Sequence, residues 1–148
     1  MSVVVMYEQH PALLDWADRV LSERLGPVRI ERPAHTISIA DDGGLVCVVA
    51  LTQFIDDMAT VTVAGVGRRF ATRRTLKAVF GYIFDVLGIR RLNTSVRSDN
   101  VEAIEFNLRS GFVREGALRK ASKVSSGDYV DMVFFGMFRE ECRWLGGV

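Results

Sequence analysis

The most constraining feature of the sequence is an apolar pattern that repeats with the period of an α-helix. Between Thr75 and Leu87 the apolar residues recur at intervals of three and four positions, which places them on one face of a helix. They are Leu76, Val79, Phe80, Ile83, Phe84 and Leu87. Gly88 follows the last of them, and glycine commonly ends a helix. The sequence therefore predicts a helix over 75–87 with one buried face.

The segments around this helix predict an alternation of strands and helices. Runs rich in β-branched and apolar residues predict strands at 3–6, 35–40, 45–54, 59–66, 91–96, 112–118 and 129–138. Helical spacing or capping residues predict two further helices, at 11–25 and at 100–109. The order β-α-β-β-β-α-β-α-β-β indicates an α/β (α+β) domain whose mixed sheet contains one parallel pair.

Length and composition bound the class of protein. A chain of 148 residues with 49% hydrophobic content can bury one core, so we expect a single domain over 1–148. The longest apolar run, Leu45–Leu51, is far shorter than the roughly 20 residues of a membrane span. Met1–Glu8 lacks the pattern of a signal peptide, and we expect a cytoplasmic protein without a membrane partner.

Cysteine and histidine are too sparse to predict a disulfide framework or a metal site. Cys47 lies in an apolar run and Cys142 in a charged tail, which fits a reducing compartment. His10 and His35 have no second His or Cys at ligand spacing, so no metal is expected.

The loop before the 75–87 helix concentrates positive charge. The segment 67–74 together with Lys77 carries five positive charges and no acidic residue. Free N–H groups at a helix start favour phosphate, and arginine side chains add paired, charge-assisted hydrogen bonds. The loop therefore predicts an anion site. A solvated basic turn and a modest nucleic-acid patch are the alternatives, and the net charge of +1 makes nucleic acid the weakest reading.

A second constellation lies on the 100–109 helix. Asn100, Ala103 and Asn107 are spaced i, i+3, i+7, within about 60° on one side of the helix. The small Ala103 permits close approach of a ligand chain, and the two amides can bind an amide-containing arm. The alternatives are that Asn100 caps the helix and that Asn107 is a solvated surface residue.

Two segments of the chain resemble the acetyl-CoA-binding core of the GNAT acetyltransferases. They are RRFATRRTLKAVFGYIFDVLGIRRL and NVEAIEFNLRSGFVREGALRKA. The resemblance is strongest to the branch of ribosomal-protein N-terminal and spermidine acetyltransferases. It is most specific at Asn100-x-x-Ala103, Gly111-Phe112, Glu115-Gly116 and Arg119. The closing GMFREECRWL is similar to small acetyltransferase-like proteins of tailed phages.

The resemblance implies a GNAT-like fold, with a mixed, mostly antiparallel sheet flanked by helices. It implies transfer of an acetyl group from acetyl-CoA to a primary amine of a small molecule or a protein. The strand that ends near Val66 is expected to pair with the pantetheine arm and to offer a backbone N–H to the thioester carbonyl. The residues expected to hold CoA are Val66, Gly67, Arg68, Arg69, Phe70, Ala71, Thr72, Arg73, Arg74, Asn100 and Ala103.

The sequence departs from the family pattern in two places. No glycine stands at the matching positions of the phosphate loop, so cofactor affinity is expected to depend more on arginine charge. Asn107 occupies the position where many relatives have a tyrosine that protonates the departing thiolate. Asparagine has no titratable proton, so Asn107 is expected to position water or the sulfur. A non-catalytic CoA-fold binding or assembly module is therefore the alternative function.

Two further expectations concern the acceptor and the tail. The carboxylates of Asp56, Asp57, Glu115 and Asp131 are candidates for attracting a cationic amine or taking its proton, although such residues are also typical of turns and surfaces. The segment Glu140–Leu145, with Trp144, is expected to pack on the body or on a second copy in a homo-oligomer.

Overall fold

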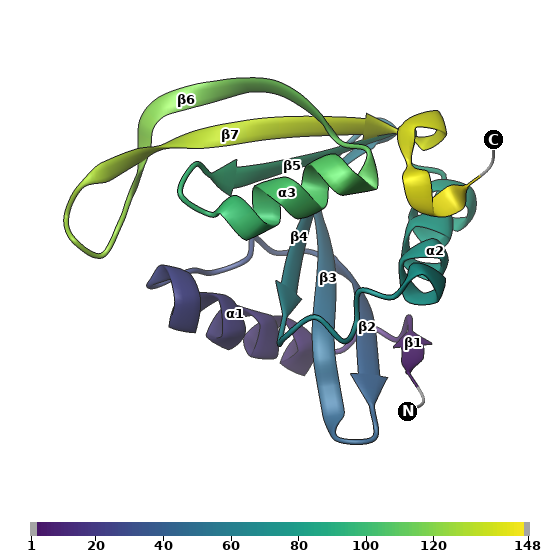
Figure 1. Ribbon diagram of the computed structural model, residues 1–148. Helices are drawn as coiled ribbons and strands as arrows, with labels where there is room; N and C mark the ends of the chain where they lie inside the picture. The colour runs from purple at the N-terminus through teal and green to yellow at the C-terminus, as the bar shows by residue number, and fades with distance from the viewer. Residues whose placement is uncertain (1–2, 147–148) are drawn as a thin grey trace.

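A seven-stranded sheet runs through the middle of the protein, which the computed structural model describes over residues 3–146. The strand order is β1-β2-β3-β4-β5-β7-β6, and every neighbouring pair is antiparallel except β4 and β5 (Figure 1). The strands are β1 Val4–Met6, β2 His35–Asp41, β3 Gly44–Ile55, β4 Met58–Gly65, β5 Arg91–Arg97, β6 Val113–Lys123 and β7 Tyr129–Phe138. This mixed, mostly antiparallel sheet confirms the predicted fold class.

Helices cover both faces of the sheet. Helix α1, Pro11–Leu25, packs its buried residues Leu14, Ala17 and Leu21 against Val48, Ala50 and Ala64 of β3 and β4. Helices α2, Arg73–Gly81, and α3, Val101–Ser110, contribute to the larger core cluster on the opposite face (Figure 1). The sheet is thus sandwiched between α1 on one side and α2 and α3 on the other.

The predicted helix over 75–87 is right in extent but not in type. Thr72 caps α2, and the regular helix ends at Gly81 and continues as a π-helical turn over Tyr82–Val86. There the N–H of Leu87 bonds the carbonyl of Tyr82 at 2.9 Å, one residue further along than in an α-helix. Periodicity predicts a buried face equally well for both geometries, so it did not reveal the change.

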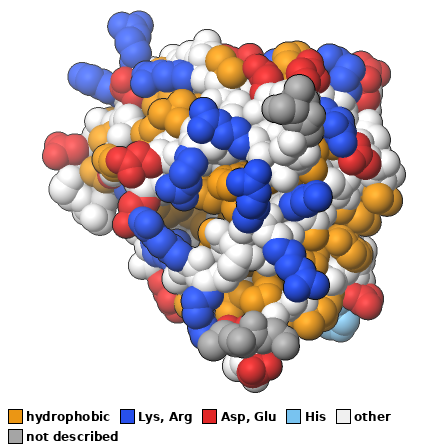
Figure 2. Space-filling view, turned by 45° about the vertical axis from the view of Figure 1, so that its right-hand side comes forward, with side chains coloured by type: hydrophobic (Ala, Val, Ile, Leu, Met, Phe, Trp, Pro, Cys, Tyr) orange, Lys and Arg blue, Asp and Glu red, His pale blue; other side chains and the backbone are white. Residues whose placement is uncertain are grey.

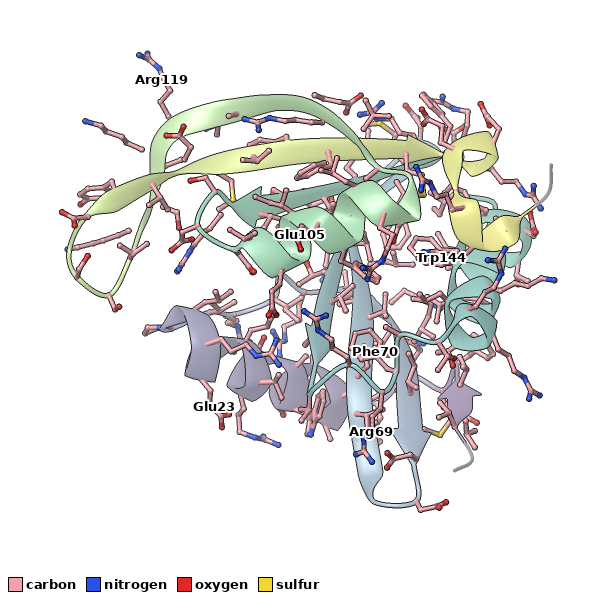
Figure 3. The ribbon with its side chains drawn as sticks, viewed as in Figure 1. Glu23, Arg69, Phe70, Glu105, Arg119 and Trp144 are labelled. Carbon is pink, nitrogen blue, oxygen red and sulfur yellow. The ribbon has the colours of Figure 1, made fainter. Side chains whose placement is uncertain are left out.

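Strand β6 is longer than the apolar pattern predicts. It runs to Lys123 rather than 118, and nearly all of its side chains are exposed. Backbone pairing with β7 continues past the last apolar residue because ladder hydrogen bonds do not require apolar side chains. The β6–β7 hairpin projects beyond the rest of the molecule, and Arg119 extends from it into solvent (Figures 1 and 3).

The C-terminal tail packs on the body, as predicted. After β7 it forms two 3₁₀ turns, Arg139–Glu141 and Arg143–Leu145. Trp144 donates its indole N–H to the hydroxyl of Ser110 on α3 at 2.9 Å, and Cys142 is buried. The tail therefore covers core residues that would otherwise meet solvent (Figure 3).

Candidate active site

Strands β4 and β5 part from each other after only three registered pairs. The last pair joins Thr60 and Asn93, and the two strands then head in different directions (Figure 1). Just past this pair, the Thr94 hydroxyl donates to the carbonyl of Val61 at 3.0 Å. We call the opening between Val61–Gly65 of β4 and Thr94–Arg97 of β5 the fork.

Backbone groups of β4 face into the fork. Along a strand, alternate residues direct their N–H and C=O groups to the same neighbour. The carbonyl of Val61 accepts from β5, and that of Gly65 accepts from Arg24 of α1, so the N–H and C=O of Val63 also face the fork. The Val63 side chain is 39% exposed although Val61 beside it is buried. Backbone groups directed away from the sheet's own ladder are the kind with which an extended, amide-containing chain pairs as an additional strand.

Val66 lies at the end of this strand but faces the other way. Its N–H donates to the carbonyl of Val46 on β3 at 2.8 Å, so this N–H is used in pairing with β3 and does not face the fork. Val63, whose backbone groups do face the fork, was missed by the sequence analysis. No side-chain pattern marks the point where a ladder breaks, so the sequence carried no signal for it.

The loop after β4 folds back onto the strand. Gly67 has a positive φ of 68°, and the N–H of Ala71 bonds the carbonyl of Arg68 at 3.0 Å. The Phe70 ring lies so close to Gly65 that a Cβ there would be 2.4 Å from it, as its inward direction in Figure 3 suggests. This loop is therefore held against the end of β4 by aromatic packing.

The loop ends at the N-terminus of α2. The Thr72 hydroxyl accepts from the N–H of Thr75 at 3.2 Å and caps the helix. The N–H groups of Arg73 and Arg74 stand before the first helical acceptor, and both side chains are exposed. Lys and Arg side chains gather across this face of the molecule around a hollow (Figure 2). The N-terminus of α2 is therefore solvent-exposed and positively charged.

The arginines of the loop differ in their partners. Arg68 pairs with Glu102 of α3 at 3.2 Å, and both side chains are more than 70% exposed. Arg69 reaches the hairpin between β2 and β3 and pairs at 3.0 Å with Asp41, whose side chain is only 1% exposed (Figure 3). An exposed pair contributes little and can exchange for phosphate, whereas Arg69 neutralises a buried carboxylate.

A depression of about 400 Å³ lies between the end of α1, the loop after β4 and the start of α3. It brings together three of the predicted residues, Gly67, Arg68 and Asn100. Its lining is Arg24, Leu25, Gly67, Arg68, Arg97, Asp99, Asn100 and Glu102. Arg24 and Arg97 were not predicted, because α1 and β5 meet the loop only in the folded chain. Arg97 holds both carboxylate oxygens of Asp99, at 3.0 and 2.9 Å, and this hydrogen bonding lowers the pKa of Asp99.

Helix α3 carries the predicted polar strip. Asn100 caps the helix, since its side-chain oxygen accepts from the N–H of Ala103 at 3.3 Å, and it also lines the depression. Ala103 is half-buried one turn further on. The strip therefore begins at the depression and leads along α3 toward Asn107.

Asn107 is a buried residue, so the alternative of a solvated surface position is wrong. It is 8% exposed, and its side-chain Nδ2 has no hydrogen-bond partner among residues 3–146. Its backbone carbonyl, by contrast, accepts from the N–H of Phe112 at 3.0 Å. A buried donor without a partner is costly and uncommon, so this Nδ2 is a candidate donor to a ligand.

The four candidate carboxylates do not form one cluster in the described structure. Asp57 pairs with Arg90 at 3.1 Å, Glu115 pairs with Arg91, and Asp131 accepts from the N–H of Lys120 at 2.9 Å. Asp56 occupies the turn between β3 and β4 with a positive φ of 54°. Each therefore has a local structural partner or turn position.

Residues 3–146 contain neither a candidate metal cluster nor a helix suited to span a membrane. No group of three or more His, Cys, Asp or Glu side chains there is placed to hold a metal ion. No helix in that range is long and apolar enough to cross a membrane.

Sequence comparison finds similarity to a protein named as an N-acetyltransferase. No protein-family model matches the chain. Over 75 residues it is 39% identical to YokL, an uncharacterized N-acetyltransferase derived from the SPbeta prophage of Bacillus subtilis strain 168. The match covers 51% of this chain and 41% of that protein, so the aligned part spans less than half of the relative's length.

Solved structures are similar over nearly the whole chain. A variant of spermidine N-acetyltransferase SpeG from Vibrio cholerae matches with a TM-score of 0.75 and 17% identity, over 97% of this chain and 96% of that one. The Vibrio cholerae enzyme in complex with CoA and spermine gives a TM-score of 0.74 and 16% identity, over 97% and 98%. At these identities the likeness establishes the fold.

Proposed function

We propose that this chain, which has the fold of the GNAT acetyltransferases, transfers an acetyl group from acetyl-CoA to a primary amine. The observation that carries the proposal is the fork at Val63, together with the depression lined by Gly67, Arg68 and Asn100, which includes Arg97 of the fork. The sequence relative, an N-acetyltransferase by name, supports the same activity.

The residues present fit a CoA thioester. The open N–H groups of Arg73 and Arg74 and the exposed guanidinium of Arg68 suit phosphate groups. An amide N–H of a pantetheine arm suits the backbone C=O of Val63, which leaves the Val63 N–H for the thioester carbonyl. The unpartnered Nδ2 of Asn107 is a spare donor on the buried part of the α3 strip.

Acetyl-CoA supplies an activated acetyl group: as the amine nitrogen bonds to the carbonyl carbon the C–S bond breaks, and the amine proton passes to water. The Val63 N–H polarises the carbonyl by donating to its oxygen, where negative charge develops. Asn107 donates through Nδ2 to the departing sulfur. A thiol titrates near pH 8.5, so a hydrogen bond rather than full protonation is sufficient help at neutral pH.

The alternative is a binding or assembly module that holds CoA without turnover. It is favoured by Phe70 filling the phosphate loop and by Asn107 at the position of the family's tyrosine. An acetyl-CoA titration followed by measurement of CoA release against polyamines, other small primary amines and peptide α-amines distinguishes the two. Release with any of these amines supports the enzyme. Tight binding without release supports the module, and absence of binding contradicts both.

Replacing Arg68, Arg73 and Arg74 together by alanine is expected to weaken acetyl-CoA binding at least tenfold, since hydrogen bonds between charged groups contribute about 1.5–3 kcal/mol. Arg69 is left in place because its loss would strand the buried carboxylate of Asp41. Calorimetry at low and high salt measures the effect, which should shrink as salt rises.

The matched control removes three positive charges from β6, by replacing Arg114, Arg119 and Lys123 with alanine. This variant has the same net charge but should bind acetyl-CoA as the parent does. Equal weakening in both variants would mean that only overall charge matters, and the loop would lose its assigned role.

A further inference from the structure

A threonine stands where the two strands of the fork separate. Thr60 is the last residue of β4 in register with β5, opposite Asn93. Its neighbours Ala59 and Val61 belong to the core on the side of α2 and α3. Side chains alternate along a strand, so Thr60 points to the opposite face of the sheet. That face is the one on which α1 covers only part of the sheet, through its contacts with β3 and β4.

The Thr60 hydroxyl belongs to a chain of three side chains with one consistent hydrogen-bond direction, in which Gln53 and Glu31 are exposed. The Nε2 of Gln53 lies 3.1 Å from a carboxylate oxygen of Glu31, and its Oε1 lies 3.2 Å from the hydroxyl of Thr60. A carboxylate only accepts, so the amide must present its N–H to Glu31 and its oxygen to Thr60. Thr60 therefore donates its only proton to Gln53, which leaves the lone pairs of its oxygen as acceptors.

The backbone of β3 is irregular at Gln53. Pairing between β3 and β4 shifts between Thr52 and Ile55, and Gln53 has a positive φ of 51°. A positive φ is unfavourable for a non-glycine residue, and bulges commonly redirect a side chain. Here the bulge accompanies an amide that reaches Thr60 across the hairpin.

The other polar residue of the last pair is already engaged. The Oδ1 of Asn93 accepts from Arg91 at 2.8 Å, and its Nδ2 faces the sulfur of Met58 at 3.9 Å. Thr60 as a residue is half-buried rather than fully enclosed. At the point where the strands part, Thr60 thus offers an acceptor of set direction.

We propose that Thr60 receives the acceptor amine, accepting a hydrogen bond from its N–H, and that Gln53 and Glu31 act as positioning residues that keep the Thr60 oxygen in the accepting state. The inference rests on the proposed function, because the amine must approach the thioester close to the point where β4 and β5 separate. Gln53 does not carry the amine proton, because a carboxamide neither gains nor loses a proton near neutral pH. The amine proton leaves to water, and the three residues orient the nucleophile.

Replacing Thr60 by valine keeps the shape of the side chain and removes the acceptor. We expect kcat/KM for the amine to fall about tenfold, through a higher KM for the amine, with acetyl-CoA affinity within about twofold of the parent. Thr60→Ser keeps the oxygen and should retain most of the activity. The matched control is Thr52→Val, the same change in the residue paired with Thr60 on β3, which should leave kcat/KM unchanged.

The polarity is tested by exchanging the two partners. In the double variant Glu31→Gln with Gln53→Glu, residue 53 still accepts from Thr60 and residue 31 donates, so parental kcat/KM is expected. Gln53→Met removes the fixed polarity and should lower kcat/KM several-fold.

Steady-state CoA release with an accepted amine, at varied amine and at varied acetyl-CoA, gives these values. A Thr60→Val variant with the parent's amine KM and kcat/KM overturns the inference while the proposed function stands. If kcat/KM of the exchanged double variant is as low as that of Gln53→Met, the positioning role of Gln53 and Glu31 is overturned. No turnover by the parent with any amine instead contradicts the proposed function, and the role of Thr60 with it.

Discussion

Replacing Asn107 by leucine is expected to lower kcat roughly ten- to hundredfold while leaving the protein at least as heat-stable as the parent. The Nδ2 of Asn107 is a buried donor with no partner in the described structure. Exchanging an unsatisfied polar group for an apolar one of similar shape is neutral or stabilising, whereas losing a hydrogen bond to a charged sulfur costs about 1.5–3 kcal/mol. The measurements are CoA release, the acetyl-CoA dissociation constant, which should change little, and the melting temperature.

The matched control is Ser110→Ala on the same helix. Ser110 is fully buried and accepts the indole N–H of Trp144, so this variant should lose stability and keep its kcat. Asn107→Asp adds a second check, because a carboxylate beside a departing thiolate should lower kcat further. A leucine variant with parental kcat would remove Asn107 from the mechanism.

Gly111→Ala is expected to destabilise the protein by roughly 3–5 kcal/mol, because it combines backbone strain with a clash. Gly111 ends α3 with a positive φ of 109°, and a Cβ there would lie 1.9 Å from the carbonyl oxygen of Glu141 in the tail. The substitution must push the tail away from α3, which uncovers Cys142 and the ring of Trp144. A fall of about 10 °C in melting temperature is the expected result.

Gly127→Ala separates strain from the clash. Gly127 also has a positive φ, of 94°, but open space surrounds the position of a Cβ. This control should therefore lose only the strain contribution, so the difference between the two variants measures tail displacement. Equal melting temperatures for both variants would contradict the contact between α3 and the tail.

Local patterns in the sequence were sufficient for the elements and their order. The spacing of Leu76, Val79, Phe80 and Ile83 predicted the main helix, and Asn100 and Gly111 bracketed α3 as its caps. These features depend on neighbours within one or two turns, so the sequence contains all the information they need. The β4–α2–β5 order similarly predicted the parallel pair, which the structure places at Met58–Thr60 and Arg91–Asn93.

The sequence by itself determined the fold class, the helix that follows the basic loop, and the polar strip of α3. Hydrophobic period, capping and charge density are local properties, so they can be read from neighbouring residues. Only the tertiary structure decided which of the basic residues pair with carboxylates and that Val63 rather than Val66 has its N–H in the fork. It also decided that the Nδ2 of Asn107 is buried with no partner among residues 3–146. It also joined Glu31, Gln53 and Thr60, which come from a loop and two strands. Burial and the direction of a hydrogen bond are set by segments distant in the chain, and no local pattern in the sequence records which segments will meet.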